Sequence, residues 1–398
     1  MDSARGLRFG GSVLRIQISE DLAEHSAVIK VVGVGGAGGN AINRMAEAGI
    51  RGVDLIAANS DAQDLRRSLA HVRVQIGDNL TRGLGVGGDS TKGRMAMLES
   101  ESQVKEILKG SDLVFITAGM GGGTGTGGAP IVASWAREME ILTIGVVTRP
   151  FSFEKSTRAG IAEEGIQEMR KSVDTLLVIP NQRLFDIIDS DTTTETAFRM
   201  ADDVLRKSIQ SISDVITTPG IINMDLNDIK AVMKDAGDAL IGMGEASGPG
   251  RAAEAARAAV HSPLLENAVM DGAKRLSVNI TARKASLRMA EIDEAMGIIG
   301  GAASQDAKIK VGAVYDESMT DAIRITVIAT GFPSSRPYRR RAKPGQSLSV
   351  GIEGQAVPGL GPDFEAAIAE TGSDGSSPSD PADWLKPAFL RFKARKIK

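Results

Sequence analysis

The sequence of 398 residues contains no cysteine. This absence excludes disulfide bonds, cysteine-ligated zinc and thiol catalysis, and it suits a reducing cytoplasm. Long apolar runs are absent as well. No stretch of about 18 apolar residues could span a membrane, and no basic and then apolar leader follows Met1. We therefore expect a soluble protein of the cytoplasm.

Net positive charge is confined to the last part of the chain, whose overall charge is −3. Residues 334–343 carry five Lys or Arg, residues 344–383 carry seven Asp or Glu and no base, and residues 384–398 carry six Lys or Arg and no acid. Together these segments carry four net positive charges, which leaves −7 for residues 1–333. We therefore expect no nucleic-acid partner.

Short runs rich in Val and Ile alternate with helical patterns in the first half of the chain. Runs that are apolar at successive residues are typical of strands buried on both faces of a parallel sheet. A long helix is predicted over Glu195–Thr217, where apolar residues recur at steps of three and four, and Pro219 ends it. The pattern predicts an α/β fold, with a Rossmann-like parallel-sheet domain over 27–194 and a long central helix over 195–219.

A second, smaller α+β domain is predicted over 220–332. Its expected elements are helices near residues 227–241, 251–260 and 287–299 and strands near 275–281, 308–315 and 323–330. Residues 1–26 are expected to form a flexible N-terminal segment. Residues 333–383 are rich in Gly, Pro, Ser and acid and predict a disordered linker, which leads to a tail over 384–398.

Two glycine-rich loops follow buried strands of the first domain. The first runs from Gly33 to Asn40, and the second is GMGGGTGTGG at residues 119–128. In a doubly wound sheet, ligands bind beyond the carboxyl ends of the strands, so both loops would face one crevice. Because N–H groups at the start of a helix carry partial positive charge, this crevice is predicted to bind phosphate.

The two glycine motifs favour different nucleotides, one a dinucleotide and the other a nucleoside triphosphate. The first loop matches G-x-G-x-x-G, and Asp54 or Asp61 could hold a ribose, as in an NAD-linked oxidoreductase. That interpretation gives no role to GGGTGTG, whose N–H groups and hydroxyls at Thr124 and Thr126 suit the phosphates of a nucleoside triphosphate. The Walker motif G-x-x-x-x-G-K-[ST] is absent. The sequence therefore favours a triphosphate site of a third kind.

GGGTGTG at residues 121–127 resembles the signature of the tubulin/FtsZ superfamily. Six further stretches resemble the FtsZ family of bacterial cell-division GTPases, in this order: VGVGGAGGNAINRM, LTRGLGVGG, VVTRPFSFE, INMDLNDI, RITVIATGF and PAFLR. The resemblance covers about 28–332 and the final motif. It implies a GTP-binding domain over 27–194, a C-terminal activation domain over 220–332, and head-to-tail filaments at the division site on the inner face of the membrane. The implied cofactors are GTP or GDP and Mg²⁺, with K⁺ as a second candidate.

The resemblance places the phosphates between the two glycine loops. The first loop contributes Gly35, Gly36, Ala37, Gly38, Gly39 and Asn40. The second contributes Gly121, Gly122, Gly123, Thr124, Gly125, Thr126 and Gly127. Two departures from the family pattern are Ala37, where glycine is commoner, and Lys155-Ser156-Thr157, which replaces a Gly-Lys-Lys-like segment.

The resemblance also assigns sugar and base contacts, which are Glu154, Arg158, Asn181, Phe198 and Asp203. Guanine offers two adjacent donors that a carboxylate such as Asp203 can accept and that adenine cannot supply. Asp202 is adjacent and could be mistaken for it. The alternatives are an exposed i,i+4 ion pair between Glu154 and Arg158, an ordinary core role for Phe198, and a solvated position for Asp203.

The stretch NMDLND supplies the expected catalytic residues Asn223, Asp225 and Asp228. Two carboxylates three residues apart at a helix start can orient water and a cation for hydrolysis. About 20 helical residues separate them from Asp203, or roughly 30 Å, so they would act on the next subunit's GTP. The alternative is that both aspartates cap the following helix. No Lys or Arg lies among 219–229, so charge relief is assigned to a cation and to loop N–H groups, without protein metal ligands.

The C-terminal tail resembles the short FtsZ peptide that binds membrane tethers and division regulators. The motif PAFLR at residues 387–391 carries this resemblance. Leu385 belongs to an apolar face with Phe389 if the segment is helical, and the expected partner contacts are Leu385, Pro387, Phe389, Leu390 and Arg391. The basic extension after Arg391 gives an alternative, which is direct attachment to an anionic membrane surface. Two other functions stay open from the sequence: a tubulin-like protein for cell shape or regulation, and the NAD-linked oxidoreductase.

Overall fold

A computed structural model describes residues 27–186, 191–218, 220–222, 224–265 and 272–332. These residues belong to one unit, Met1–Ser335. The expectations for residues 1–26, for the linker 333–383 and for the tail 384–398 lie outside the described residues, as does Asn223.

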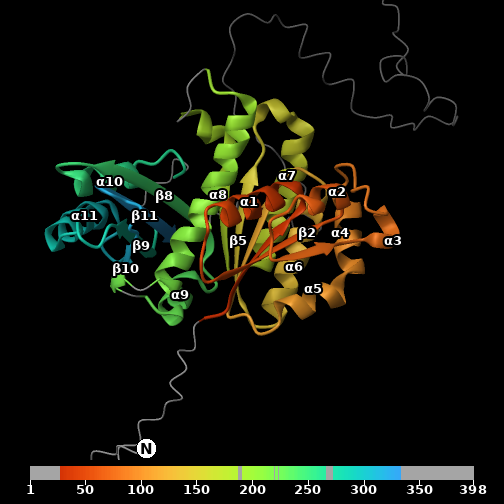
Figure 1. Cartoon of the computed structure of the whole chain (residues 1–398), viewed down its shortest axis with the longest axis horizontal. Coiled ribbons are helices and arrows are strands. Elements are labelled where there is room, and N and C mark those ends of the chain that lie inside the picture. The colour runs from red at the N-terminus through yellow and green to blue at the C-terminus, as the bar shows by residue number, and fades with distance from the viewer. Residues whose placement is uncertain (1–26, 187–190, 219, 223, 266–271, 333–398) are drawn as a thin grey trace, which may run out of the picture. The chain divides into compact units, whose positions relative to one another are not determined.

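Six parallel strands form the sheet of the first domain. They are β1 (Ile29–Val34), β2 (Val53–Asn59), β3 (Val72–Gln75), β4 (Leu113–Gly119), β5 (Leu142–Arg149) and β6 (Thr175–Pro180). Their order is β3-β2-β1-β4-β5-β6. The runs of Val and Ile are buried on successive residues because helices cover both faces of the sheet, as Figure 1 shows. The predicted Rossmann-like parallel sheet is confirmed.

The two faces of this sheet belong to two separate cores, and side chains alternate between them. Along β4, Leu113 and Phe115 belong to one core, whereas Val114 and Ile116 belong to the other. The helices of this domain are α1 (Gly35–Glu47), α2 (Ala62–Arg66), α3 (Asp78–Thr81), α4 (Ser90–Glu99), α5 (Glu101–Leu108), α6 (Thr124–Glu138) and α7 (Ser156–Ser172). Two short 3₁₀ helices, Ser152–Glu154 and Asn181–Asp186, follow β5 and β6.

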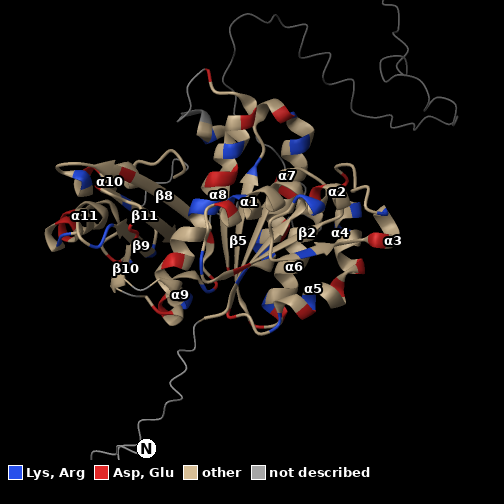
Figure 2. Cartoon of the chain, in the orientation of Figure 1, with Lys and Arg blue, Asp and Glu red and all other residues tan. Residues whose placement is uncertain are grey.

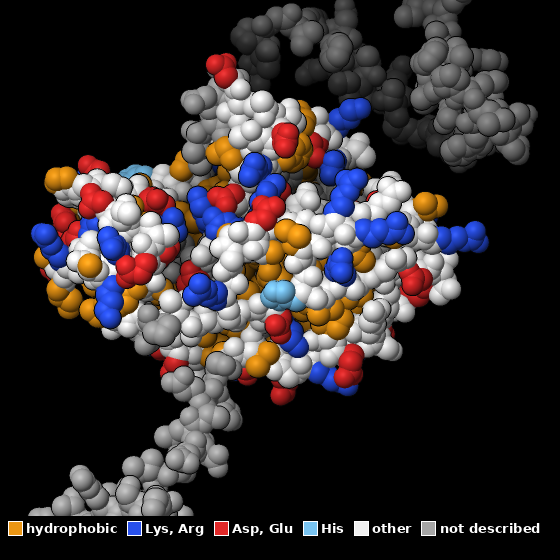
Figure 3. Space-filling model, viewed as in Figure 1, with side chains coloured by type: hydrophobic (Ala, Val, Ile, Leu, Met, Phe, Trp, Pro, Cys, Tyr) orange, Lys and Arg blue, Asp and Glu red, His pale blue; other side chains and the backbone are white. Residues whose placement is uncertain are grey.

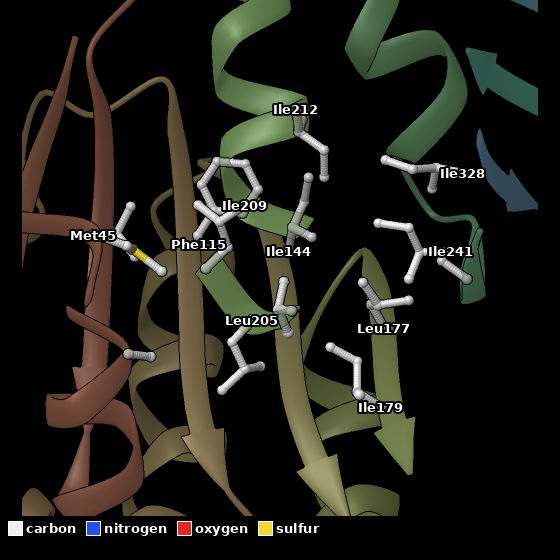
Figure 4. Close-up of a cluster of buried hydrophobic side chains, with 14 of the residues drawn as sticks. Met45, Phe115, Ile144, Leu177, Ile179, Leu205, Ile209, Ile212, Ile241 and Ile328 are labelled. Carbon is white, nitrogen blue, oxygen red and sulfur yellow. The ribbon is translucent and has the colours of Figure 1, made fainter. Parts of the chain in front are cut away.

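The long helix α8 (Thr194–Thr217) lies where the sequence predicts a helix. Its hydroxyl cap is Thr193, which accepts a hydrogen bond from the N–H of Thr196 at 3.2 Å. Figure 4 shows Leu205, Ile209 and Ile212 of α8 packed among strand residues of both domains. Those strand residues are Phe115, Ile144, Leu177 and Ile179 from the first domain and Ile241 and Ile328 from the second. One apolar core therefore ties α8 to both domains.

The second domain follows α8 directly. Its elements are β7 (Gly220–Ile222), α9 (Leu226–Met233), β8 (Gly237–Ser247), α10 (Arg251–Val260), β9 (Arg275–Ala282), α11 (Met289–Ala302), β10 (Lys308–Tyr315) and β11 (Ala322–Thr330). The strands are ordered β8-β11-β9-β10-β7, with one parallel pair, β9 and β10, and antiparallel pairs otherwise. This arrangement is the mixed sheet of the predicted α+β domain.

Two features of this domain differ from the sequence-based expectation. The helix expected over 227–241 ends at Met233, and a strand begins at Gly237. The chain turns there because Asp235 and Gly237 have φ values of +49° and +73°, which a helix cannot contain. Strand β8 then pairs in parallel with β6, so the sheets of the two domains form one sheet of eleven strands.

The described surface carries mixed charge. Figure 2 shows acidic and basic residues alternating along the outer helices. In the space-filling view of the same face, both signs are interspersed with hydrophobic side chains (Figure 3). No helix of the described part is long and apolar enough to cross a membrane.

Candidate functional site

A cavity of about 440 Å³ opens at the carboxyl ends of the parallel strands. Its walls include Val34 at the end of β1, Gly119 at the end of β4 and Thr148 near the end of β5. Asn181, directly after β6, closes the other side. The cavity therefore lies at the edge where doubly wound sheets bind their ligands.

The first glycine loop forms the start of α1, and Gly36 and Ala37 line the cavity. Gly35 has a φ of +72°, and a methyl group there would lie 2.8 Å from the backbone nitrogen of Gly125 in the second loop. A methyl group on Gly38 would lie 2.6 Å from a carbonyl oxygen of β4. The predicted contacts of this loop that lie outside the cavity lining are Gly35, Gly38, Gly39 and Asn40. Close packing against the second loop and β4 requires glycine at Gly35 and Gly38.

The second glycine loop leads into α6. Some of its residues line the cavity, and others lie behind the lining and hold the loop in place. The residues that line the cavity are Gly122, Gly123, Thr124 and Gly125. The residues behind them are Gly121, Thr126 and Gly127. Thr126 fixes the loop from behind, because its Oγ1 accepts a hydrogen bond from the N–H of Gly121 at 2.9 Å. The Oγ1 of Thr124 lies 2.7 Å from the hydroxyl of Ser60, which anchors the cavity side of the loop.

Helices α1 and α6 both begin at the cavity without a side-chain cap. Their N-cap residues, Val34 and Gly123, make no side-chain hydrogen bond to the first turn, and neither first turn contains an acid. The first N–H groups of a helix lack intrahelical partners and carry partial positive charge. Two such termini at one cavity make it suited to an anion with several oxygens, such as a polyphosphate.

Two further segments form part of the cavity wall. One is the loop Leu84–Gly88, and the other contains Asn59, Ser60, Asp61 and Asp64. The sequence predicts a ligand role for Asp61 only in the NAD-linked alternative, and it assigns no contact to Asn59, Ser60, Asp64 or the loop, although the glycines of LTRGLGVGG are a signal for a ligand loop. Asn59 donates a hydrogen bond from Nδ2 to Asp64 Oδ2 at 2.7 Å. Burial and then the charge of Asp61 raise the pKa of Asp64.

Glu154 and Arg158 both line the cavity and form an ion pair of 2.8 Å between Oε2 and Nη1. The Glu154 side chain is only 8% exposed and also accepts a hydrogen bond from the N–H of Phe151 at 2.8 Å. The i,i+4 pair foreseen as an alternative is therefore present, but Glu154 is buried in the cavity wall. Between them, Lys155 has φ +77° and ψ +155°, a conformation that favours glycine. This strain coincides with the departure at Lys155-Ser156-Thr157.

Asn181 and Phe198 form the end of the cavity nearest α8. Asn181 is 5% exposed, and its Oδ1 has no hydrogen-bond partner among the described residues. A buried carbonyl without a partner is unfavourable unless a ligand supplies the donor. Phe198 is 40% exposed and makes an edge contact with Phe151 at 5.3 Å between ring centroids. Its ring is thus available to a planar ligand, unlike the ring of an ordinary core residue.

Asp202, not Asp203, lies on the cavity wall. Asp203 is absent from the lining and forms ion pairs with Arg206 at 2.7 Å and with Lys207 at 3.1 Å. Burial opposes the charge of Asp203, but these two partners outweigh it and lower its pKa. Burial raises the pKa of Asp202 to about 7, and the charge of Arg44 opposes the rise. The order of two adjacent aspartates on α8 thus decides which of them faces the cavity, and the sequence reasoning selected the one that does not.

The Asp loop, which we define as Met224–Asp228, lies beyond the far end of α8 from the cavity. Asp225 caps α9, since its Oδ1 accepts a hydrogen bond from the N–H of Asp228 at 2.8 Å. The carboxylate of Asp228 pairs with Lys310 of β10 at 2.5 Å. The cap foreseen as an alternative is therefore present, and neither aspartate lines the cavity of its own chain. Sequence reasoning missed Lys310, which lies 82 residues from its partner.

Two family models match the chain. Residues 28–189 match the GTPase domain of the Tubulin/FtsZ family, and residues 237–333 match the C-terminal domain of the FtsZ family. The cell division protein FtsZ of Pseudomonas aeruginosa is 44% identical over 398 residues, with 95% of this chain and 99% of the relative covered.

Solved structures give the same result for the fold. An empty FtsZ dimer from M. jannaschii has a TM-score of 0.75 and 41% identity, with 78% of this chain and 90% of the other covered. A GTPγS-bound protofilament of CetZ2 from Haloferax volcanii has a TM-score of 0.66 over 78% of this chain and 94% of the other. At 18% identity, this second likeness concerns the fold alone.

Proposed function

The chain belongs to the FtsZ family of tubulin-like GTPases. We propose that the cavity binds GTP and that the Asp loop completes the site of a neighbouring subunit for hydrolysis. The protein is a GTPase that binds guanine nucleotide, self-associates into filaments and acts in cell division. Membership of a GTPase family leaves no support for the oxidoreductase alternative. The proposals below concern the residues that bind GTP, the cation, the catalytic residues and the partners.

The nucleotide is proposed to lie in the cavity with its phosphates at the starts of α1 and α6. The observation that carries this assignment is the meeting of two uncapped helix N-termini in one cavity. The hydroxyl of Thr124 and the guanidinium of Arg158 line the same cavity and can contact these phosphates. Glu154 and Asn181 line the wall on the way to Phe198, whose exposed ring would stack on the base.

Recognition of guanine is assigned to Asp202 in place of Asp203. Asp202 lines the cavity on the same helix as Phe198, and no ion pair of 4 Å or less joins it to a described Lys or Arg. A carboxylate there can accept from both adjacent donors of guanine. Asp203 is occupied by Arg206 and Lys207, which makes it the poorer acceptor.

Mg²⁺ is proposed as the accompanying cation. The carboxylates of Asp61 and Asp64 line the cavity, and Asp64 Oδ2 would lie 3.5 Å from a methyl group on Gly36 of the first glycine loop. Carboxylate, phosphate and water oxygens are the ligands that Mg²⁺ prefers. A cation there would favour the ionised form of Asp64, whose pKa is raised by burial. When bound, the ion would neutralise phosphate charge. K⁺ is a second candidate.

Asp225 and Asp228, with Asn223, are proposed to complete the site of the next subunit in the filament. Two observations support this role: both carboxylates are on the surface, and α8 separates them from the cavity of their own chain. A helix of 24 residues is about 36 Å long, so they cannot reach their own nucleotide. The carboxylates would then position the attacking water at a γ-phosphate held by another chain.

A mixing experiment tests this shared site. Asp225→Ala should bind GTP normally and hydrolyse it poorly, whereas Thr124→Ala should be damaged in the cavity. Mixed filaments would contain interfaces that join an intact cavity to an intact Asp loop. Some turnover should therefore return when the two variants are mixed and co-assemble. If co-assembly is confirmed and no activity returns, catalysis is confined within one chain.

The tail and the cellular location rest on the sequence pattern. Residues 384–398 are proposed to bind membrane tethers and division regulators. The contacts would be Leu385, Pro387, Phe389, Leu390 and Arg391. Such tethering would place the filament in the cytoplasm, at the division site on the inner face of the membrane. The alternative occupant of the basic extension is an anionic membrane surface.

A further inference from the structure

Strand β10 holds the start of the Asp loop in place through β7 and Met224. The short strand β7 pairs with it through Ala313–Ile222 and Val314–Gly220. Met224 is 3% exposed, and its sulfur would lie 3.5 Å from a methyl group on Gly312 of β10. In Figure 1, α9 lies next to β10 at the lower end of α8. The start of the Asp loop is thus fixed by backbone pairing and apolar packing against one strand.

Lys310 stands two residues before Gly312, so both lie on the same face of β10. Its ammonium reaches the end of the Asp loop, with 2.5 Å between Nζ and Asp228 Oδ1. Lys310 is 45% exposed in its side chain and Asp228 is 31% exposed. Strand β10 therefore supports the Asp loop and also contributes the surface cation Lys310.

The charges that act most strongly on Lys310 belong to the Asp loop. The hydrogen bond and the charge of Asp228, and then the charge of Asp225, raise the pKa of Lys310. Lys310 is therefore charged throughout the neutral pH range. Lys230 is also basic and lies on α9, but Lys310 is the residue that the geometry joins to Asp228.

Two carboxylates that approach a triphosphate are repelled by it. An ammonium held against one of them cancels part of the repulsion at distances of several ångströms, where unit charges still interact appreciably. The same ion pair restricts the rotamers of the Asp228 side chain on an exposed helix start. Both effects would matter at the moment when the Asp loop meets the nucleotide of another chain.

We propose that Lys310 is a positioning residue for GTP hydrolysis between subunits. It orients the Asp228 carboxylate and offsets its charge as the Asp loop docks against the next subunit's triphosphate. This inference rests on the proposed role of Asp225 and Asp228 in the neighbouring site. Lys310 acts through Asp228 and is not itself assigned a contact with GTP.

The test compares Lys310→Met with Lys308→Met. Lys308 is exposed on the same face of β10 as Lys310. In the strand register it lies opposite Arg275 of β9, at the end of β10 away from β7. Its replacement therefore removes an equal charge without removing the ion pair to Asp228. Sedimentation with GTP gives the critical concentration for assembly, and phosphate release gives turnover per assembled subunit. Lys310→Met should raise the critical concentration about threefold to tenfold at low salt and lower turnover. Lys308→Met should stay close to the parent in both.

Two further readouts separate this role from a merely structural one. The defect of Lys310→Met should shrink as salt rises from about 0.05 M to 0.5 M, because salt screens exposed charges. Lys310→Arg keeps the charge and should restore most of the activity. GTP affinity of the unassembled subunit should be unchanged in all three variants, because the cavity is untouched. In an Asp228→Asn background, Lys310→Met should have no further effect on assembly.

Several outcomes would overturn the inference. Equal behaviour of Lys310→Met and Lys308→Met at low salt would do so, as would faster turnover, which would show that Lys310 restrains Asp228. Failure of the underlying function is recognised separately. If Asp228→Asn hydrolyses GTP normally, the role of the Asp loop is wrong. If Asp228→Asn is inactive and Lys310→Met is normal, only the role of Lys310 is wrong.

Discussion

At the scale of single residues, the proposed recognition of guanine depends on which acid of α8 faces the cavity. Asp202 and Asp203 are adjacent, but a helix turns about 100° per residue, so only one of them can face the cavity. Asp202 lines the cavity, and Asp203 is bound to Arg206 and Lys207. The two aspartates therefore form a matched pair for experiment, with similar chemistry and different surroundings.

We predict that Asp202→Ala weakens GTP binding by about 1.5–3 kcal/mol, the usual range for hydrogen bonds to a charged group. Asp203→Ala should leave the affinity within about 0.5 kcal/mol, since it changes a surface ion pair. Equilibrium titration with GTP and with ATP would measure both affinity and base preference. The reverse ranking of the two variants would restore Asp203 to the site.

A pH dependence of binding follows from the same residue. Burial raises the pKa of Asp202 to about 7 in the nucleotide-free chain. Guanine needs the ionised carboxylate, so binding must release a proton when Asp202 is protonated. GTP affinity should fall as the pH drops from about 8 to 6, approaching tenfold per unit below the pKa. Titration calorimetry in two buffers would detect this proton release, and Asp202→Ala should abolish it while Asp203→Ala keeps it.

The raised pKa of Asp202 affects folding stability in the opposite direction: the free energy of unfolding falls as the pH rises, whereas GTP affinity rises. An unfolded Asp has a pKa near 3.9, so the folded chain binds the Asp202 proton more tightly between that value and about 7. The contribution of Asp202 to the free energy of unfolding is therefore full below pH 4 and is lost as the pH rises through 7. Binding of GTP thus favours the protonation state that destabilises the empty fold.

At the scale of elements, α6 and α4 are packed backbone against backbone. A methyl group on Gly127 of α6 would overlap the carbonyl oxygen of Ser90 at the start of α4. This contact holds the second glycine loop from behind. The glycines of GGGTGTG therefore serve two purposes, since some face the ligand and others allow this close approach.

Gly127→Ala should destabilise the fold by about 1–3 kcal/mol, the usual effect of overpacking, and should weaken GTP binding because the loop must shift. Gly160→Ala is the control, since Gly160 lies inside α7 and an added methyl group would meet no atom within 4 Å beyond its chain neighbours and the adjacent backbone of its own helix. That change should be neutral or stabilise by about 0.5–1 kcal/mol. Chemical denaturation measures both. Equal stability of the two variants would contradict the packing argument.

The elements also show what sequence reasoning could reach. Runs of Val and Ile predicted the parallel sheet, and steps of three and four predicted α8, because each pattern reflects local burial. The pattern over 227–241 predicts one helix because strand β8 is partly apolar and follows α9 after a short turn, whereas the chain forms α9 and then β8. Contacts between residues far apart in the sequence leave no local pattern: the Lys310–Asp228 pair joins residues 82 positions apart and depends on the folded topology.

At the scale of the whole molecule, the tail should recruit partners without contributing to hydrolysis. Deleting residues 384–398 removes six basic residues and no acid. Assembly and GTP turnover should remain close to those of the full chain, because the cavity and the Asp loop lie within residues 27–332. Binding to anionic vesicles or to a tether protein should be lost. Co-sedimentation and phosphate release measure these properties together, and a loss of turnover on deletion would contradict this division of roles.

The placement of the cavity and the Asp loop at opposite ends of α8 has a numerical consequence for a filament. If the Asp loop completes the site of the next subunit, as proposed, a single row of n subunits contains n nucleotides but only n − 1 complete hydrolytic centres. One terminal subunit always holds GTP that no neighbour can hydrolyse, while the other terminus exposes an Asp loop that faces no nucleotide. The two tips therefore differ chemically even though every subunit is identical, so growth and shrinkage have a built-in direction, and short rows age more slowly per subunit than long ones.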